Sequence, residues 1–126
     1  MVLICGIPNA GKTTFSKKYE NVIHVDDFAK IRKERGDKKL TLGDFVAEAS
    51  EDICVEGVMW RKANRESLVK RCGKKRKVCI WLDTPLEICI ERETRGRSRV
   101  FFEHEYAHFE PPTYSEGWDE IIIIHG

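Results

Sequence analysis

The chain has 126 residues, of which 41% are hydrophobic and 34% are charged, and these proportions are typical of one globular domain with its own core. Its apolar runs are too short to span a membrane and its N-terminus lacks the pattern of a secretory signal, so we expect a cytoplasmic protein with no membrane partner. The formal net charge of +1 excludes a strong attraction of the whole molecule to nucleic acid, so any such attraction has to be local.

Short apolar runs alternate along the chain with longer amphipathic stretches. The runs are rich in Val and Ile, as buried strands are, and they cover residues 2–5, 22–25, 53–55, 78–82 and 121–124. Helical patterns cover residues 11–20, 41–50, 61–72, 85–95 and 100–109. Thr41 is the expected N-cap of the second helix, and Pro85 fits the first turn of the fourth. Strands separated by helices predict right-handed crossovers, and hence a single α/β domain over residues 1–126 with a three-layer sandwich and a mostly parallel sheet of about five strands.

The first predicted strand leads directly into residues 6–14, GIPNAGKTT. They match the pattern G-x-x-x-x-G-K-[ST] between a strand and a helix, in which backbone N–H groups surround phosphate oxygens. Gly6 and Gly11 allow the backbone angles that this arrangement needs. Lys12 is expected to reach the β- and γ-phosphates of ATP, Thr13 to ligate Mg²⁺ and Thr14 to contact the α-phosphate region. The predicted ATP-binding segment is completed by Pro8, Asn9 and Ala10.

This segment alone does not distinguish a kinase from a GTPase or a motor ATPase. The strings Asn-Lys-x-Asp and Asp-x-x-Gly of a GTPase are absent, and the chain is short for a motor ATPase core, so a small kinase remains. Asp26 and Asp27 follow the second predicted strand, at the end of the sheet where parallel strands bind ligands. We assign to Asp26 the role of accepting the proton of an attacking hydroxyl, and to Asp27 that of a substrate-positioning or metal-shell group.

Two later strands end in an acidic residue that is a candidate to support Mg²⁺ through water. Glu56 closes the string DICVEG, and Asp83 closes VCIWLD. By pattern alone Asp83 is preferred, because an apolar run that closes on Asp is the usual form of such a strand.

These motifs resemble the P-loop kinase family. VEGVMWR is similar to the strand of nucleoside monophosphate kinases that ends Asp-Gly-x-Pro-Arg, and WLDTPLEICIERETRGR is similar to their later strand, helix and arginine-bearing lid. The resemblance implies that Glu56, rather than Asp83, is the metal-side or acceptor-side acid.

The same resemblance implies a small arginine-rich lid around residues 92–100, with Gly96 easing its closure. In the family register Arg92 stacks over adenine, and Arg95 or Arg97 reaches the transferring phosphoryl group, for which the fixed fork of a guanidinium is suited. A solvated helix end of mixed charge is the alternative, because Glu residues alternate with the arginines.

A longer resemblance connects GIPNAGKTTF, the Asp pair and the terminal FEPPTYSEGWDEIIII with the kinase module of polynucleotide 5′-hydroxyl kinases and their relatives, which include the kinase of seryl-tRNA. It implies that the nucleic-acid partner and acceptor is the 5′-OH end of DNA or RNA. Two arginines of that family are replaced here by Val25 and Ala29, so Arg32, Arg61 or Arg65 is expected to bind the acceptor's phosphate in their place. Of these three, Arg65 best matches the family's arginine downstream of the third strand. The terminal segment is expected either to pack near the nucleotide base or to form a structural turn.

Two other kinds of function stay open. One is a kinase of the same fold that acts on a small molecule, a nucleotide or an aminoacylated tRNA. The other is an ATP-binding switch module without catalysis.

Several further segments are expected to be structural. Residues 30–40 carry many charges and predict an exposed, mobile connection, and the basic residues 71–77 predict a solvated turn at the amino ends of the strands. The pair His104 and His108 has no zinc-site pattern. The five cysteines contain no Cys-x-x-Cys pair, so we expect reduced thiols that pack as small hydrophobic groups.

Overall fold

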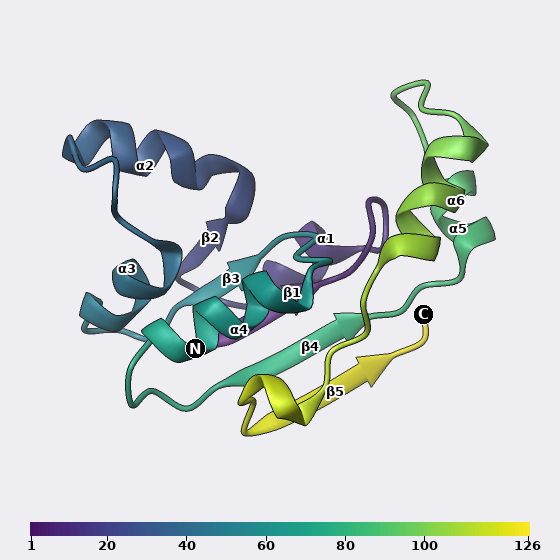
Figure 1. Cartoon of the computed structure of the whole chain (residues 1–126). Coiled ribbons are helices and arrows are strands. Elements are labelled where there is room, and N and C mark those ends of the chain that lie inside the picture. The colour runs from purple at the N-terminus through teal and green to yellow at the C-terminus, as the bar shows by residue number, and fades with distance from the viewer.

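The computed structural model describes residues 1–126 and places five strands in one sheet with the order β2-β3-β1-β4-β5. Every pair of neighbouring strands is parallel (Figure 1), which confirms the α/β prediction and extends it, because no strand is antiparallel. The strands are β1 (Val2–Cys5), β2 (Val22–His24), β3 (Cys54–Glu56), β4 (Val78–Leu82) and β5 (Glu120–Ile124).

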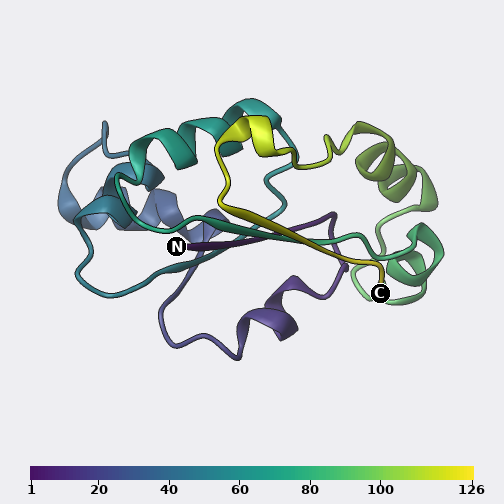
Figure 2. The ribbon, with the colours of Figure 1, turned by 90° about the horizontal axis from the view of Figure 1, so that it is seen from below.

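The direction of each crossover decides which face of the sheet its helices cover. The step from β1 to β2 runs one way along the sheet, and the steps to β3, β4 and β5 run the other way. Because such crossovers are right-handed, the first must lie on the opposite face from the rest. Figure 2 shows α1 alone on one face and α4 and η2 on the other, so the three-layer prediction is confirmed. The helices are α1 (Lys12–Ser16), α2 (Phe28–Arg35), α3 (Leu42–Glu48), α4 (Lys62–Arg71), α5 (Leu86–Glu91) and α6 (Arg99–His108), with 3₁₀ turns η1 (Val25–Asp27) and η2 (Tyr114–Glu116).

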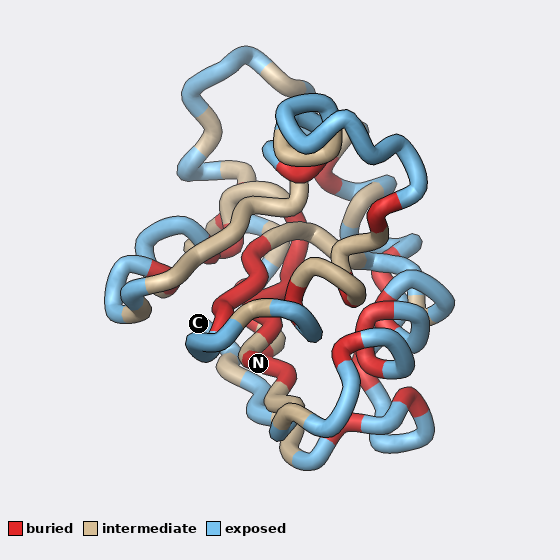
Figure 3. The backbone as a smooth tube through the Cα atoms, turned by 90° about the vertical axis from the view of Figure 1, so that its left-hand side faces the viewer, coloured by how far each residue is buried: buried red, intermediate tan, exposed pale blue.

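The core is centred on β1, the middle strand of the sheet. Leu3, Ile4 and Cys5 have no exposed surface, and burial in Figure 3 is concentrated along the strands while the outer turns are exposed. A strand that is covered on both faces has to be apolar throughout, which is why Val2–Cys5 is a continuous run rather than an alternating one. All five cysteines are free and buried, as predicted. No helix has the length and apolar character that crossing a bilayer requires.

The expected mobile connection over residues 30–40 is wrong in its first half, because residues 28–35 form α2. The helix ends at Gly36, whose φ of 65° is left-handed. Its stabilising contacts are aromatic and cationic rather than aliphatic: Phe28 meets the ring of Phe45 edge-on with centroids 5.9 Å apart, and the Arg32 guanidinium lies 4.9 Å from the Phe28 centroid. A search for aliphatic periodicity does not detect such a helix.

The other helices lie close to their predicted positions and differ at their ends. Thr41 is the N-cap of α3 as expected, and its Oγ1 accepts a hydrogen bond from the Asp44 N–H at 3.1 Å. Pro85 precedes α5 as its N-cap instead of lying in its first turn. α1 stops at Ser16 and α5 at Glu91, both short of the predicted ends.

Candidate active site

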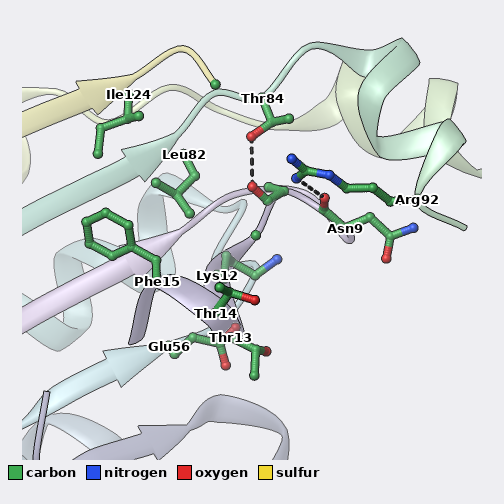
Figure 4. A pocket seen from close by; sticks show the side chains of 13 residues that line it. Asn9, Lys12, Thr13, Thr14, Phe15, Glu56, Leu82, Thr84, Arg92 and Ile124 are labelled. Atoms are coloured by element: carbon green, nitrogen blue, oxygen red, sulfur yellow. Dashed lines mark hydrogen bonds between the residues drawn. The ribbon is translucent and has the colours of Figure 1, made fainter. Parts of the chain in front are cut away.

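The loop between β1 and α1 has the backbone geometry of a phosphate-binding turn. Asn9 and Gly11 have left-handed φ angles of 67° and 102°. A Cβ added to Gly6 would lie only 2.8 Å from the Leu82 carbonyl oxygen, so a side chain there would push the loop away from β4. The Thr84 hydroxyl donates to the Ala10 carbonyl at 2.8 Å and ties the loop to the end of β4 (Figure 4). The glycines of the motif are therefore required by close backbone packing.

A cavity of about 680 Å³ opens over this loop, and we call it the nucleotide cavity. Its volume is within the range of sites that bind cofactors and other small ligands. It extends from the amides that follow Asn9 to the ends of β4 and β5, so the phosphate-binding turn occupies one end of a longer groove. It is lined by Asn9, Ala10, Gly11, Lys12, Thr13, Thr14, Phe15, Glu56, Leu82, Thr84, Arg92, Ile124 and Gly126.

Lys12 is a buried cation at the phosphate end of this cavity. Its Nζ donates to the carbonyl oxygen of Ile7 at 2.8 Å. Burial lowers the pKa of Lys12, and the negative charge of Glu56 is the largest effect in the opposite direction. A polyanion in the cavity would stabilise the protonated form further, so the site fits the phosphates of ATP.

Glu56 lies in the nucleotide cavity and Asp83 does not, so the structure favours the choice that the family resemblance implied. Glu56 is 7% exposed, and it is hydrogen-bonded to His24 Nδ1 at 2.6 Å across the ends of β3 and β2. Asp83 instead contacts His125, with its Oδ2 3.1 Å from Nδ1.

The oxygens of Thr13 and Glu56 that line the cavity fit a magnesium site of the kind found in kinases. Such sites take one or two protein oxygens and complete the shell with phosphates and water. The chain has no group of three or more His, Cys, Asp or Glu side chains arranged to hold a metal.

Asp26 and Asp27 lie in η1, directly after β2, and both are exposed. They lie outside the nucleotide cavity, but Asp26 is close enough to Lys12 for its charge to act on the pKa of that lysine. The turn is held against the end of β3, because a Cβ on Gly57 would meet the Val25 side chain at 2.6 Å. Glycine at position 57 therefore allows β2 to place the Asp pair beside Glu56.

Of the four arginines in residues 92–100, Arg92 and Arg97 contact the loop, whereas Arg95 does not and Arg99 pairs with Glu87. Arg92 lines the nucleotide cavity, and its Nη1 donates to the Asn9 carbonyl at 3.1 Å. Arg97 donates from Nη2 to Asn9 Oδ1 at 3.2 Å and from Nε to Glu93 Oε2 at 2.7 Å. The hydrogen bond from Arg97 lowers the pKa of Glu93 to about 2. Arg95 is exposed.

The sequence matches no family model, and a search of curated proteins finds no significant match. The fold does have a solved counterpart. A gluconokinase from Sinorhizobium meliloti superposes with a TM-score of 0.66 over 98% of this chain and 81% of that chain, at 14% sequence identity. The chain has the fold of a P-loop kinase. At this identity the likeness establishes the fold, and residues 6–14 can be called its P-loop.

Arg65 is buried in the core, which counts against its predicted role in binding the acceptor's phosphate. Arg65 has no exposed surface, and its Nε and Nη2 donate to the two carboxylate oxygens of Glu116 at 2.8 and 3.1 Å. It also donates to the carbonyl oxygens of Met59, at 2.7 Å, and Glu110, at 2.6 Å. A guanidinium enclosed in this way joins α4 to the segment after α6 and has no surface to offer to an acceptor.

The terminal segment FEPPTYSEGWDEIIII forms the structural turn that was one of its two predicted roles. Trp118 is buried and its Nε1 donates to Glu116 Oε1 at 3.0 Å. Gly117 has a φ of 106°, and a Cβ there would lie 2.7 Å from Val69 Cγ1 of α4. Of this segment only Ile124 lines the nucleotide cavity, but Phe109 and Pro111 line a smaller cavity that shares Leu82 and Thr84 with it, so packing near the nucleotide base stays a prediction.

The basic residues 71–77 lie at the amino ends of the strands, as expected, and several of their charges have partners. Arg71 pairs with Asp44 at 3.5 Å, and Arg76 pairs with Glu120 at 2.9 Å. Two of the five basic side chains are thus paired, and the cluster lies at the other end of the strands from the P-loop.

Sequence reasoning missed the roles of Thr84, His24 and the Asn9 side chain. The Asn9 amide donates to the Cys89 carbonyl at 3.0 Å and so connects the P-loop to α5. Thr84 and His24 lie at or just beyond the carboxyl ends of parallel strands. Ligands bind at the carboxyl ends of parallel strands, so polar residues at the predicted strand ends are the sequence signal that points to Thr84 and His24.

Proposed function

We propose that this protein is an ATP-dependent kinase that transfers the γ-phosphoryl group to a hydroxyl of a small molecule. The observation that carries the proposal is one cavity in which the P-loop, buried Lys12 and the Glu56 carboxylate meet, with Asp26 at the end of the adjoining strand. The matched fold is that of a gluconokinase, which favours a small hydroxylated acceptor over a polynucleotide end.

The residues divide the work of holding a triphosphate. The backbone amides of the P-loop surround the phosphates, and Lys12 leaves the Ile7 carbonyl to contact the outer ones. Mg²⁺, held by Thr13 with support from Glu56, neutralises charge on the phosphates when it is bound. Pro8, Ala10 and Thr14 shape the turn around the inner phosphates.

Asp26 acts on the acceptor. In the transfer the hydroxyl oxygen bonds to the γ-phosphorus, the bond from that phosphorus to the bridging oxygen breaks, and ADP carries away the electron pair. The Asp26 carboxylate accepts the hydroxyl proton, and Asp27 helps to position the acceptor.

Residues 92–100 act as the lid. Arg92 touches the P-loop at the nucleotide cavity, which supports its role of stacking on adenine when ATP is bound. Arg97 is held by Glu93 and Asn9 in this conformation, while Arg95 is exposed, and one of the two turns onto the transferring phosphoryl group when the lid closes. An arginine in this role contributes about 10³-fold or more to the rate.

The polynucleotide 5′-hydroxyl reading stays a prediction without support from the fold comparison. Its substrate arginine, Arg65, is buried, and residues 71–77 lie away from the P-loop. A switch module that binds ATP without transfer is the other alternative, and the same experiment separates all three.

The test is transfer of label from γ-labelled ATP to a panel of sugar acids, polyols, nucleosides and 5′-hydroxyl oligonucleotides. We expect a small hydroxylated acceptor to take the label, and the variant Asp26→Asn to lower the rate by about 10²–10⁴-fold, as for loss of a general base. Affinity for a fluorescent ATP analogue should stay unchanged in that variant.

Asp27→Asn is the matched control, because it removes the neighbouring carboxylate in the same turn. It should affect acceptor KM more than kcat. Tight ATP binding without transfer to any acceptor would favour the switch module, and labelled oligonucleotides alone would restore the polynucleotide reading. An Asp26→Asn variant with the rate of the wild type would exclude Asp26 as the base.

A further inference from the structure

A second cavity lies next to η1, and Val25 of that turn lines it. It has a volume of about 350 Å³ and is enclosed by α2, α3, α4 and the connection between α2 and α3, and the two cavities share no lining residue. Figure 1 shows α2 and α3 beyond the β2 edge of the sheet, and α4 packs against α3. The volume suits a small metabolite. We call it the cationic cavity because of the charges described next.

Three cationic side chains line this cavity and no acidic side chain does. They are Arg32, Lys38 and Lys39, and none of the three takes part in an ion pair. Arg35, one turn along α2 from Arg32 and outside the cavity, pairs with Glu48. Like charges that line one cavity repel one another unless an anion is present.

Arg32 in addition has a buried nitrogen without a hydrogen-bond partner. Its Nε is the one buried side-chain nitrogen or oxygen without a hydrogen bond. Buried polar groups almost always have a partner, so an isolated one calls for an explanation. The Phe28 ring fixes the guanidinium from one side, at 4.9 Å, and leaves the donors to be used by something else. An anionic ligand group is the partner that fits.

Apolar side chains also line the cavity, and two of them, Leu40 and Leu68, are buried. Apolar walls lower the local dielectric and so strengthen the attraction between a bound anion and the cations. Met59 lines the same wall in a left-handed conformation, with a φ of 45°, and its carbonyl accepts from buried Arg65. Strained backbone held by a buried guanidinium is a feature of binding sites, and it shows how Arg65 supports this wall without contacting a ligand.

The cavity is adjacent to the proposed base. Val25 and Phe28 both line it, and Asp26 and Asp27 lie between them in the chain. A molecule in the cationic cavity would therefore lie beside the Asp pair.

We infer that the cationic cavity holds the acceptor through an anionic group, so that the acceptor is a small molecule with a hydroxyl and a carboxylate or a phosphate monoester. This inference rests on the proposed kinase function for the identity of the ligand as an acceptor. Arg32 is the principal contact, Lys38 and Lys39 add charge, and Asn64 is a neutral hydrogen-bonding group on α4.

The experiment is calorimetric titration of the nucleotide-free protein with sorbitol, gluconate and sorbitol 6-phosphate, which share a carbon chain and differ in charge. We expect one or both anions to bind at least about tenfold more tightly than sorbitol, as for a charge-assisted contact. The two anionic arms distinguish a carboxylate from a phosphate site. In Arg32→Gln the advantage of the anions should disappear, and in Arg35→Gln, the control from the same helix, it should stay.

A double variant, Lys38→Gln with Lys39→Gln, keeps the test informative if Arg32→Gln is unstable, and it should weaken anion binding without affecting sorbitol. Equal binding of the three probes, no binding of either anion at millimolar concentrations, or full anion binding by Arg32→Gln would each overturn the inference. Binding of a 5′-hydroxyl dinucleotide alone, with dependence on Arg32, would overturn the small-molecule class.

The titration contains no ATP, so it is independent of catalysis. If anions bind with dependence on Arg32 but no phosphate is transferred, the proposed kinase function is wrong and the inferred anion site still stands. If Arg32→Gln transfers phosphate with the acceptor KM of the wild type, the inferred anion site is wrong and the proposed kinase function still stands.

Discussion

Replacing Arg65 by Met tests whether this residue holds the fold or binds a substrate. Arg65→Met removes the only cation that faces Glu116 in the core, and both side chains are 0% exposed. It also leaves the carbonyl oxygens of Met59 and Glu110 without their donor. Removing one partner of a buried ion pair costs about 3–5 kcal/mol, because the other charge stays buried without compensation.

That loss is large compared with the free energy of unfolding of a typical domain, about 5–15 kcal/mol. With a urea m-value of about 1–3 kcal/mol/M, a loss of ~4 kcal/mol lowers the unfolding midpoint by roughly 1.3–4 M. Urea titration followed by tryptophan fluorescence measures this shift directly, since Trp118 is buried against Glu116.

Arg76→Met is the matched control. It breaks an ion pair of similar length, 2.9 Å to Glu120, but the two side chains are 69% and 46% exposed. An exposed pair contributes about 0–1 kcal/mol, so the midpoint should change little. The double variant Arg65→Met with Glu116→Leu should recover part of the loss, because the two residues are coupled. A variant Arg65→Met that is as stable as Arg76→Met, with a raised acceptor KM, would refute the structural role and restore the substrate-binding one.

Two further predictions concern ionisation. Burial by itself raises the pKa of Glu116, but hydrogen bonds from Arg65 and Trp118 outweigh it and lower the pKa below that of a free Glu. The Glu116 carboxylate therefore adds stability above the unfolded-state pKa of about 4.3, and this stability is lost as the pH falls through the folded pKa. As the pH is lowered from neutral to acid, the urea midpoint should fall less steeply in Glu116→Gln than in the wild type. An equal fall in the two proteins would contradict the lowered pKa of Glu116. Burial raises the pKa of Cys54 to about 12 and also raises the pKa of Cys72 and Cys89. A disulfide reagent that modifies thiols should therefore leave the native protein unmodified at about pH 8 and react with all five thiols in denaturant. Rapid modification of the native protein would show that these thiols are accessible.

The sequence alone was sufficient for the P-loop, the alternation of strands and helices and the parallel sheet. These features depend on neighbouring residues: a glycine where φ is positive, an apolar run where a strand is covered on both faces, and a hydroxyl at a helix N-terminus. Thr41 and Gly11 have the predicted conformations for this reason. The α2 helix was missed because its stabilising contacts reach Phe45, in the next helix, instead of repeating along its own face.

Only the tertiary structure decided which charged residues face a ligand and which face each other. Arg65 and Glu116 are 51 positions apart, and no pattern within either segment shows that they meet in the core. In the sequence Arg32 is one of several charged residues of its segment, and only the packing of α2 near α3 and α4 makes it line a cavity. Likewise, Glu56 and Asp83 both follow apolar strands, but only Glu56 lines the nucleotide cavity. The physical reason is that the environment of a charge depends on burial and on distant partners, and both are set when the crossovers pack against the sheet.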